Sequence, residues 1–278
     1  MSGEWTLATW NVNSIKARLE RVQDWLKQAG PDFLFIQELK CADENFPAQA
    51  FRDAGYEHID VHGQKSYNGV AVIGKYPFET QHKGLPALPK SDDQARYIEI
   101  EADIGGASWT LGGLYAPNGN PVSEGPVSSG SGIYGPKFDY KLKWLRALKT
   151  RMDEIFATGK PAAFSGDFNI IPEPRDCYDP EAWAGDALYH GEARRMWRIY
   201  QNAGFLDAYR ALNPSCQEAY TFWDYQGGAW RRNNGIRIDH ILLTPEGADR
   251  LRAAWIDPAP RGEEKASDHT PVLAQFVS

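Results

Sequence analysis

Two polar side chains stand close together where an apolar segment ends, in the stretch 161–169. Asp167 and Asn169 are two positions apart, a spacing that in extended backbone places both side chains on one face of a strand. Phe168, between them, then points to the opposite face. A carboxylate and a carboxamide presented together can bind a hard cation or a phosphate. This pair is therefore the first candidate for chemistry in the chain.

Three further segments end apolar runs with groups of the same kind. Asn11 and Asn13 follow one run, Glu38 follows another, and the pair Asp268 and His269 precedes the last. Taken singly, each has an ordinary explanation as a turn former or a surface cap. Four apolar strands that end in oxygen or imidazole ligands are costly to build without a purpose, because polar groups near a core must be compensated. The joint pattern indicates a site.

Magnesium-assisted phosphodiester cleavage is the chemistry that suits this set. Mg²⁺ takes one or two carboxylates together with water and phosphate oxygens, and Glu38 with help from Asp268 or Asn11 provides such a sparse ligand set. The three cysteines lie far apart and no histidines cluster, which favours a hard cation over zinc. His269 could orient a phosphate or exchange a proton, and Asp239 is a candidate to orient its imidazole.

Two neighbouring residues have competing interpretations. Tyr115 could donate its hydroxyl to a phosphate, but it could equally be a core tyrosine at a strand end. His240, next to Asp239, is expected to be a structural histidine. The sequence leaves the role of Tyr115 open.

Alternating short strands and helices would have to position these groups. The pattern predicts strands at 4–9, 32–37, 70–73, 97–102, 109–115, 161–167, 236–243 and 272–276, and helices at 15–29, 47–54, 138–156 and 192–202. Ser14 is expected to cap the first helix and Gly30 to end it. The Gly/Pro/Ser-rich loop 116–136 is too long for an ordinary connection, which indicates a functional or mobile segment. With no repeat or linker, we expect one α/β domain over residues 1–278.

Composition limits the class of protein. With 42% hydrophobic and 13% aromatic residues the chain is globular. No apolar stretch is long enough to span a bilayer and no signal peptide is visible, so we expect a cytoplasmic protein with no membrane partner. The net charge of −7 argues at first against nucleic acid. A phosphate backbone responds to the local field, however, and the stretches 137–151 and 230–237 are basic. A solvated helix face is the ordinary explanation for the first of them.

Eight short segments occur in order along nearly the whole chain, and together they resemble the exonuclease III / AP endonuclease family of DNA repair enzymes. They are Thr9–Asn13, Ile36–Glu38, Asn68–Ala71, Tyr115–Gly119, Gly166–Asn169, Tyr220–Trp223, Gly235–Asp239 and Ser267–His269. The resemblance implies a four-layer α/β sandwich, in which two mixed sheets pack face to face with helices outside. It also implies Mg²⁺- or Mn²⁺-dependent hydrolysis of DNA phosphodiesters, as 3′→5′ exonuclease, 3′-phosphatase and abasic-site endonuclease. The expected partner is double-stranded DNA with 3′ ends, nicks or abasic sites, bound by a monomer.

Carried over by matching position, the resemblance assigns roles around the metal. The residues that it places there are Asn11, Glu38, Asp167, Asn169, Asp268 and His269. Glu38 is similar to the main metal ligand. Asp167 resembles the residue that positions or deprotonates the attacking water, with a second metal as an option. Asn169 resembles the amide that steadies the pentacovalent phosphorane.

The resemblance also assigns contacts to the DNA. His269, oriented by Asp239, would hold the scissile phosphate, and Tyr115 would contact the same phosphate with support from Asn118. Trp223, with Phe222 as an alternative, would lie against the extruded sugar or the terminal base. The remaining expected contacts are Arg231 and Arg232 to the groove or backbone, and Asn68 as an amide that orders the site.

One departure from the family pattern bears on substrate choice. Tyr189 and His190 stand where a loop should approach the lesion pocket, and their bulk would favour 3′-end processing over internal incision. Two other classes stay open: a lipid or inositol-phosphate phosphodiesterase of the same fold, and a non-catalytic nucleic-acid-binding regulator. The aromatic and basic segment 223–237 favours DNA over a lipid or inositol phosphate. A non-catalytic regulator would have lost its acidic residues, and the sequence has Glu38, Asp167, Asp239 and Asp268.

Overall fold

Two six-stranded sheets form the centre of the molecule in the computed structural model, which describes residues 3–123 and 133–277. The first sheet has the order β11-β12-β1-β2-β4-β3 and the second the order β5-β6-β7-β8-β10-β9. The first comprises β1 (Glu4–Asn11), β2 (Phe33–Gln37), β3 (His58–His62), β4 (Val70–Gly74), β11 (Leu251–Ile256) and β12 (Val272–Val277). The second comprises β5 (Glu79–Lys83), β6 (Tyr97–Ile104), β7 (Ala107–Tyr115), β8 (Ala162–Asp167), β9 (Leu206–Asp207) and β10 (Asp239–Leu243).

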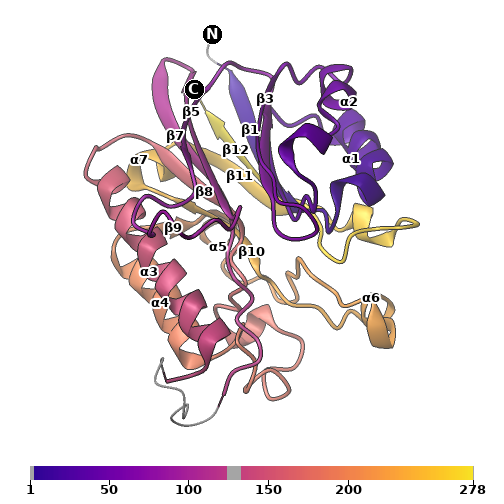
Figure 1. Ribbon diagram of the computed structural model, residues 1–278, viewed down its shortest axis with the longest axis vertical. Coiled ribbons are helices and arrows are strands. Elements are labelled where there is room, and N and C mark those ends of the chain that lie inside the picture. The colour runs from indigo at the N-terminus through magenta and orange to yellow at the C-terminus, as the bar shows by residue number, and fades with distance from the viewer. Residues whose placement is uncertain (1–2, 124–132, 278) are drawn as a thin grey trace.

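Helices cover the outer face of each sheet (Figure 1). The helices that cover the first sheet are α1 (Ile15–Ala29) and α2 (Ala48–Arg52), and those that cover the second are α3 (Pro136–Phe156) and α4 (Gly191–Asn202). The others are α5 (Ala208–Leu212), α6 (Ala229–Arg232), α7 (Pro245–Ala248) and the 3-10 turns η1 (Asp43–Asn45), η2 (Pro174–Asp176), η3 (Gln226–Gly228) and η4 (Ala259–Gly262). The expected four-layer α/β sandwich is therefore confirmed. In the part of the chain that the structure describes, every helix is too short or too polar to cross a bilayer.

Aromatic side chains fill the layer between the two sheets. Trp5 of β1 stacks on Phe276 of β12 with ring centroids 4.6 Å apart, and both contact Trp109 of β7, at 4.8 Å and 5.0 Å. Gly113 of β7 faces the ring of Phe35, where an added Cβ would lie 2.0 Å from a ring carbon. The sheets can therefore approach closely at this point only because residue 113 has no side chain.

The first helix begins differently from the expectation. Ser14 precedes α1 with φ 92° and ψ 105°, and its side chain makes no capping hydrogen bond. Ser14 therefore occupies the predicted N-cap position, but it does not cap the helix with its side chain. The expected end is confirmed: Gly30 adopts the left-handed conformation and its N–H donates to the carbonyl of Leu26.

The sequence pattern failed at the margins of both sheets. The strands that it did not predict are β3, β5, β9 and β11, which are the edge strands. In β5, His82 is half-buried and the other four residues are exposed, so the strand lacks the alternation that identifies a strand with one buried face. Polar residues on edge strands prevent pairing with other chains. The missing signal therefore has a physical cause.

Several strands of both sheets end at the same end of the sandwich. The parallel pair β1 and β2 and the parallel pair β7 and β8 deliver Asn11, Glu38, Tyr115 and Asp167 there. Strand β10 runs antiparallel to β8 and begins with Asp239 opposite Asp167. The two termini lie together at the other end of the strands (Figure 1).

Gly113→Ala should destabilise the protein by about 1–3 kcal/mol, because the added methyl group would overpack against the ring of Phe35. The free energy of unfolding in urea measures the effect. Gly191→Ala is the matched control, since its methyl group would meet no atom within 4 Å. Equal stability of the two variants would contradict the close approach of the sheets at residue 113.

Candidate active site

A cleft of about 300 Å³ lies at the end of the sandwich where these strands terminate. The predicted residues that line it are Glu38, Tyr115, Asn118, Asp167, Asn169, Asp268 and His269. The lining residues that the sequence did not single out as cleft residues are Asn120, Trp183, Asp186, Leu188, Asp224 and Ile238. Phe222, which was named only as an alternative to Trp223, also lines the cleft. The structure thus brings together groups that are widely separated in the chain.

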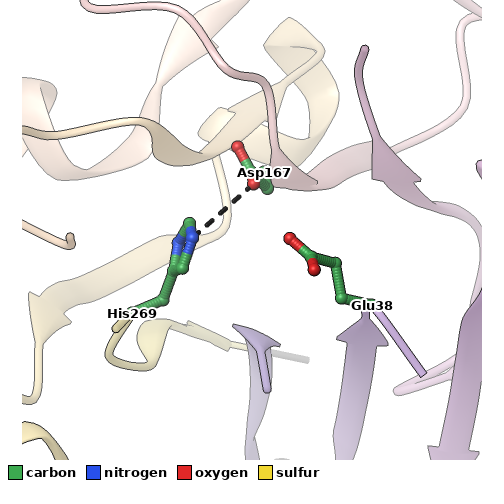
Figure 2. A group of neighbouring side chains, drawn as sticks. All are labelled: Glu38, Asp167 and His269. Atoms are coloured by element: carbon green, nitrogen blue, oxygen red, sulfur yellow. Dashed lines mark ion pairs between the residues drawn. The ribbon is translucent and has the colours of Figure 1, made fainter. Parts of the chain in front are cut away.

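Glu38, Asp167 and His269 all line this cleft and form a compact group (Figure 2). Each offers one ligand atom, and these atoms lie within 4.8 Å of one another. The Nε2 atom of His269 is 3.8 Å from Oδ2 of Asp167. The two carboxylates, with no thiolate beside them, suit a hard divalent cation that keeps open positions for water and phosphate. The donor set therefore fits a metal-dependent hydrolase.

The backbone at Gly166 decides where Asp167 projects. Gly166 has φ +150°, and an added Cβ would lie 1.9 Å from the carbonyl oxygen of Leu114. Any side chain at position 166 would push β8 away from β7. Beyond the strand, Asn169 adopts φ 50°, and its N–H donates to Oδ1 of Asp167 at 2.8 Å. Glu38 also has a positive φ, 55°, a conformation that costs energy for a residue with a side chain.

The two carboxylates have different environments. Burial raises the pKa of Glu38, but the hydrogen bond from Asn11 and the charge of Lys40 outweigh it and lower the pKa below its ordinary value. For Asp167, burial and then the charge of Asp239 raise the pKa to about 7, against the opposing effects of His269 and Asn11. Glu38 is therefore suited to hold a cation, and Asp167 is suited to exchange a proton near neutral pH.

Asp239 and His269 form the orienting pair that the sequence suggested. Nδ1 of His269 is 2.8 Å from Oδ2 of Asp239, and both side chains are buried. Burial lowers the pKa of His269, but the charge and hydrogen bond of Asp239, followed by the charge of Asp167, raise it to about 10. The imidazole is therefore a cation at neutral pH with Nε2 directed toward the cleft, where it can donate to an anion.

Tyr115 lies beside this group. Burial, and then the charges of Glu38 and Asp167, raise its pKa well above the ordinary value, so the phenol stays protonated and can donate a hydrogen bond. The guanidinium of Arg96 stacks on the other side, 4.8 Å from the ring centroid. His240 is buried between Arg237 and the carbonyl of Ile170, which fits the structural role expected for it.

Two of the expected metal ligands are oriented otherwise. Asn11 donates from Nδ2 to Glu38 at 2.9 Å and to Asp167 at 3.0 Å, while its oxygen accepts the N–H of Asn13. It therefore presents an amide nitrogen to the carboxylates, and nitrogen of that kind does not ligate a hard cation. Asp268 lines the cleft but accepts a hydrogen bond from the Asn13 side chain, outside the compact group of three.

Two expected DNA contacts are also placed elsewhere. Trp223 is 3% exposed, donates to Asn233 and packs edge-on against Trp230 at 4.8 Å. It cannot stack on a base, because it forms the small core beneath α6. Phe222 lines the cleft instead, 5.0 Å from the ring of His269. Asn68 is buried, and its carbonyl accepts the N–H of Lys40, so it orders the turn after Glu38 through its backbone.

The two loop residues expected near a lesion pocket, Tyr189 and His190, do not line the cleft. Tyr189 lies under the guanidinium of Arg194, and His190 caps α4 and packs on Phe138. The prediction that their bulk fills the pocket is therefore wrong, because both side chains are used to start a helix and cover its base. Trp183, from the same segment, lines the cleft in their place.

Other residues of the expected DNA surface remain available. Arg231 and Arg232 are exposed on α6, which projects from the two-sheet body (Figure 1). Asn118 is exposed at the rim of the cleft. Residues 124–132 of the loop 116–136, which the sequence indicates to be a functional or mobile segment, lie outside the described residues.

Comparison with known proteins agrees with this geometry. The endonuclease/exonuclease/phosphatase family matches residues 8–269. Exodeoxyribonuclease III of Haemophilus influenzae is 29% identical over 274 residues, which cover 96% of this chain and 98% of that protein. Two solved structures each cover 98% of this chain and 99% of their own at a TM-score of 0.85. They are a 3′ phosphatase from Neisseria bound to a product DNA hairpin, 37% identical, and an AP endonuclease from Archaeoglobus fulgidus, 36% identical.

Asp239→Asn should lower the pKa of His269 from about 10 toward or below its ordinary 6.5, because burial then acts with less opposition. NMR titration of the imidazole in metal-free protein measures the change. Asp53→Asn, at an exposed carboxylate at the end of α2, is the control and should leave the titration unaltered. An unchanged His269 pKa in Asp239→Asn would contradict the pairing.

Proposed function

The chain belongs to the endonuclease/exonuclease/phosphatase family, and from this we propose that it is a Mg²⁺-dependent DNA repair nuclease that processes 3′ ends. The observation that carries the proposal is the group of Glu38, Asp167 and His269, assembled from both sheets in an open cleft. Relatives with high coverage are described as an exodeoxyribonuclease, a 3′ phosphatase and AP endonucleases. Hydrolysis of a DNA phosphodiester is the reaction that these names share with the geometry.

Glu38 and Asp167 are the residues that would hold Mg²⁺, or Mn²⁺ in its place. Their oxygens are hard donors and leave most of a six-coordinate shell to water and phosphate. When bound, the cation supplies positive charge that stabilises the charge developing on the phosphate. Asn11 keeps the two carboxylates in register, because its amide donates to both.

The side chains around the metal would bind the attacking water and the phosphate. Asp167 positions the attacking water and accepts its proton. His269, held as a cation by Asp239, donates from Nε2 to a phosphate oxygen. Tyr115 donates its phenolic hydrogen to the same phosphate. Asn169 sits next to Asp167 and contributes its amide to the phosphorane.

A few basic side chains are available to the DNA at and beside the cleft. Lys40 lies beside Glu38 with Nζ 2.9 Å from Oε2, and α6 presents Arg231 and Arg232. Phe222 offers an aromatic face at the cleft for a sugar or terminal base. These groups explain how a protein with a net charge of −7 can bind a polyanion.

The pocket wall favours a terminal nucleotide over an extruded internal sugar. Trp183 and Leu188 line the cleft together with the metal group, and the cleft volume of about 300 Å³ is at the small end for a ligand pocket. A 3′ end can enter without passing a continuous strand over this wall. We therefore propose that 3′-end processing exceeds internal abasic-site incision, with Trp183 in the role first expected of Tyr189 and His190.

Glu38→Gln and Asp167→Asn should each lower Mg²⁺-dependent cleavage of a labelled 3′-recessed duplex by at least about a hundredfold, because each removes a hard ligand or a base. Cleavage is followed with and without EDTA. Glu57→Gln, at an exposed carboxylate outside the cleft, is the matched control. Wild-type protein that binds DNA without metal-dependent cleavage would contradict the enzyme proposal and favour a non-catalytic regulator.

Trp183→Ala should raise incision at an internal abasic analogue relative to 3′-end removal, because it widens the cleft. The ratio of the two rates on matched duplexes is the measurement. Trp255→Ala removes a half-exposed indole from β11, away from the cleft, and should leave the ratio unchanged. If wild-type protein already incises the abasic duplex as fast as it removes 3′ ends, the proposed preference fails.

A further inference from the structure

A lysine lies within the apolar face of α3. Lys141 is 0% exposed and stands three residues after Phe138 and four before Leu145, both of which are fully buried. Its Nζ donates to the carbonyls of Asn118 at 2.9 Å, Asn169 at 2.6 Å and Ala187 at 3.0 Å. An ammonium has three N–H donors, so backbone carbonyls use its full capacity.

The three carbonyls belong to three different walls of the cleft. Asn118 follows β7 and lies close to Tyr115, and Asn169 follows β8 and lies next to the metal group. Ala187 lies between Asp186 and Leu188, which also line the cleft. One buried cation therefore connects the segments that carry the phosphate contact, the nucleophile side and the pocket wall.

A second set of bonds joins two of the same segments. Asn120 donates from Nδ2 to the carboxylate of Asp186 at 3.1 Å and 3.0 Å, and its Oδ1 accepts the N–H of Ala187 at 3.0 Å. Gly119, with φ +94°, leaves room for the lysine, since an added Cβ would lie 2.8 Å from Cδ of Lys141. We call Lys141, Asn120 and Asp186 the clasp.

Stability alone does not account for the clasp. Burial lowers the pKa of Lys141 to about 7, against the opposing charges of Asp186 and Asp167. In the described part of the chain the hydrogen-bond partners of Nζ are these three carbonyls, and it forms no ion pair with a carboxylate that would offset its burial. An apolar residue at this position of α3 would avoid the desolvation penalty of an ammonium, although it would leave the three carbonyls without this donor. The cation instead fixes the positions of carbonyls on loops that have no regular structure of their own.

We propose that Lys141 is a positioning residue for the nuclease site, which through the clasp sets the wall of the pocket and so the choice between DNA substrates. The inference rests on the proposed function. Loss of the ammonium frees three loops at once, so that Tyr115, Asn169 and Asp186 no longer hold their relative positions. A small misplacement of reacting groups is enough to slow a positioned reaction strongly.

Lys141→Met keeps the length of the side chain and removes its donors. At a temperature well below its melting point, kcat/KM on a 3′-recessed duplex should fall about tenfold to a hundredfold, with a change in the ratio to abasic-site incision. Hydrogen exchange should accelerate in segments 168–172 and 183–190. Lys143→Met, the same substitution at an exposed position of α3, should alter neither readout. Leu148→Ala, at a buried position of α3, should lower stability without changing the ratio or exchange in those segments.

Two results would overturn the inference. One is a folded Lys141→Met protein with wild-type kinetics and exchange, and the other is identical behaviour of Lys141→Met and Leu148→Ala at matched stability. If Lys141→Met does not fold, Asn120→Ala replaces it, and unchanged exchange in 183–190 together with an unchanged substrate ratio sinks the proposal. A wild-type protein inactive on every duplex would instead refute the proposed function, while the exchange measurements would still test the clasp.

Discussion

The site depends on holding like charges together at the junction of two sheets. Glu38 comes from the first sheet, and Asp167 and Asp239 from the second. Carboxylates at this separation repel each other unless protons, cations or hydrogen-bond donors lie between them. Asn11 supplies one solution, because its amide bridges Glu38 and Asp167, and the protonated His269 supplies another. The arrangement leaves net negative charge at the centre, and a divalent cation would complete its compensation.

The remainder of the fold keeps the two sheets at the separation that these contacts need. The aromatic cluster of Trp5, Trp109 and Phe276 packs the interior, and Gly113 permits the close approach opposite Phe35. Because β1, β2, β7 and β8 all end at the same end of the sandwich, a small shift between the sheets would change the distance from Glu38 to Asp167 directly. The packing of the core therefore sets the separation of the sheets, and through it the geometry of the site.

The sequence predicted the fold class, the central strands and the residues of the compact group, because buried strands and polar residues at their ends leave strong local patterns. It missed the four edge strands, of which β5 is polar and almost fully exposed and β9 has only two residues. The family resemblance assigned Trp223 to the DNA, and their bulk assigned Tyr189 and His190 to the pocket. The direction of each side chain is set by tertiary contacts, which the sequence does not show. The orientation of Asn11 was equally out of reach, since it depends on the backbone N–H of Asn13.

Lys141 shows where a sequence signal was present but ambiguous. It lies in a basic stretch, and a solvated helix face is the ordinary explanation of such a run. Its spacing from Phe138 and Leu145, however, places it on the apolar stripe, where an unpaired charge is unusual. What the sequence cannot supply is the partner, because the acceptors are backbone carbonyls, which every residue possesses. Residue types in the sequence thus predict the side chains that carry out the chemistry. Side chains that shape the pocket through hydrogen bonds to the backbone can be identified only in the folded structure.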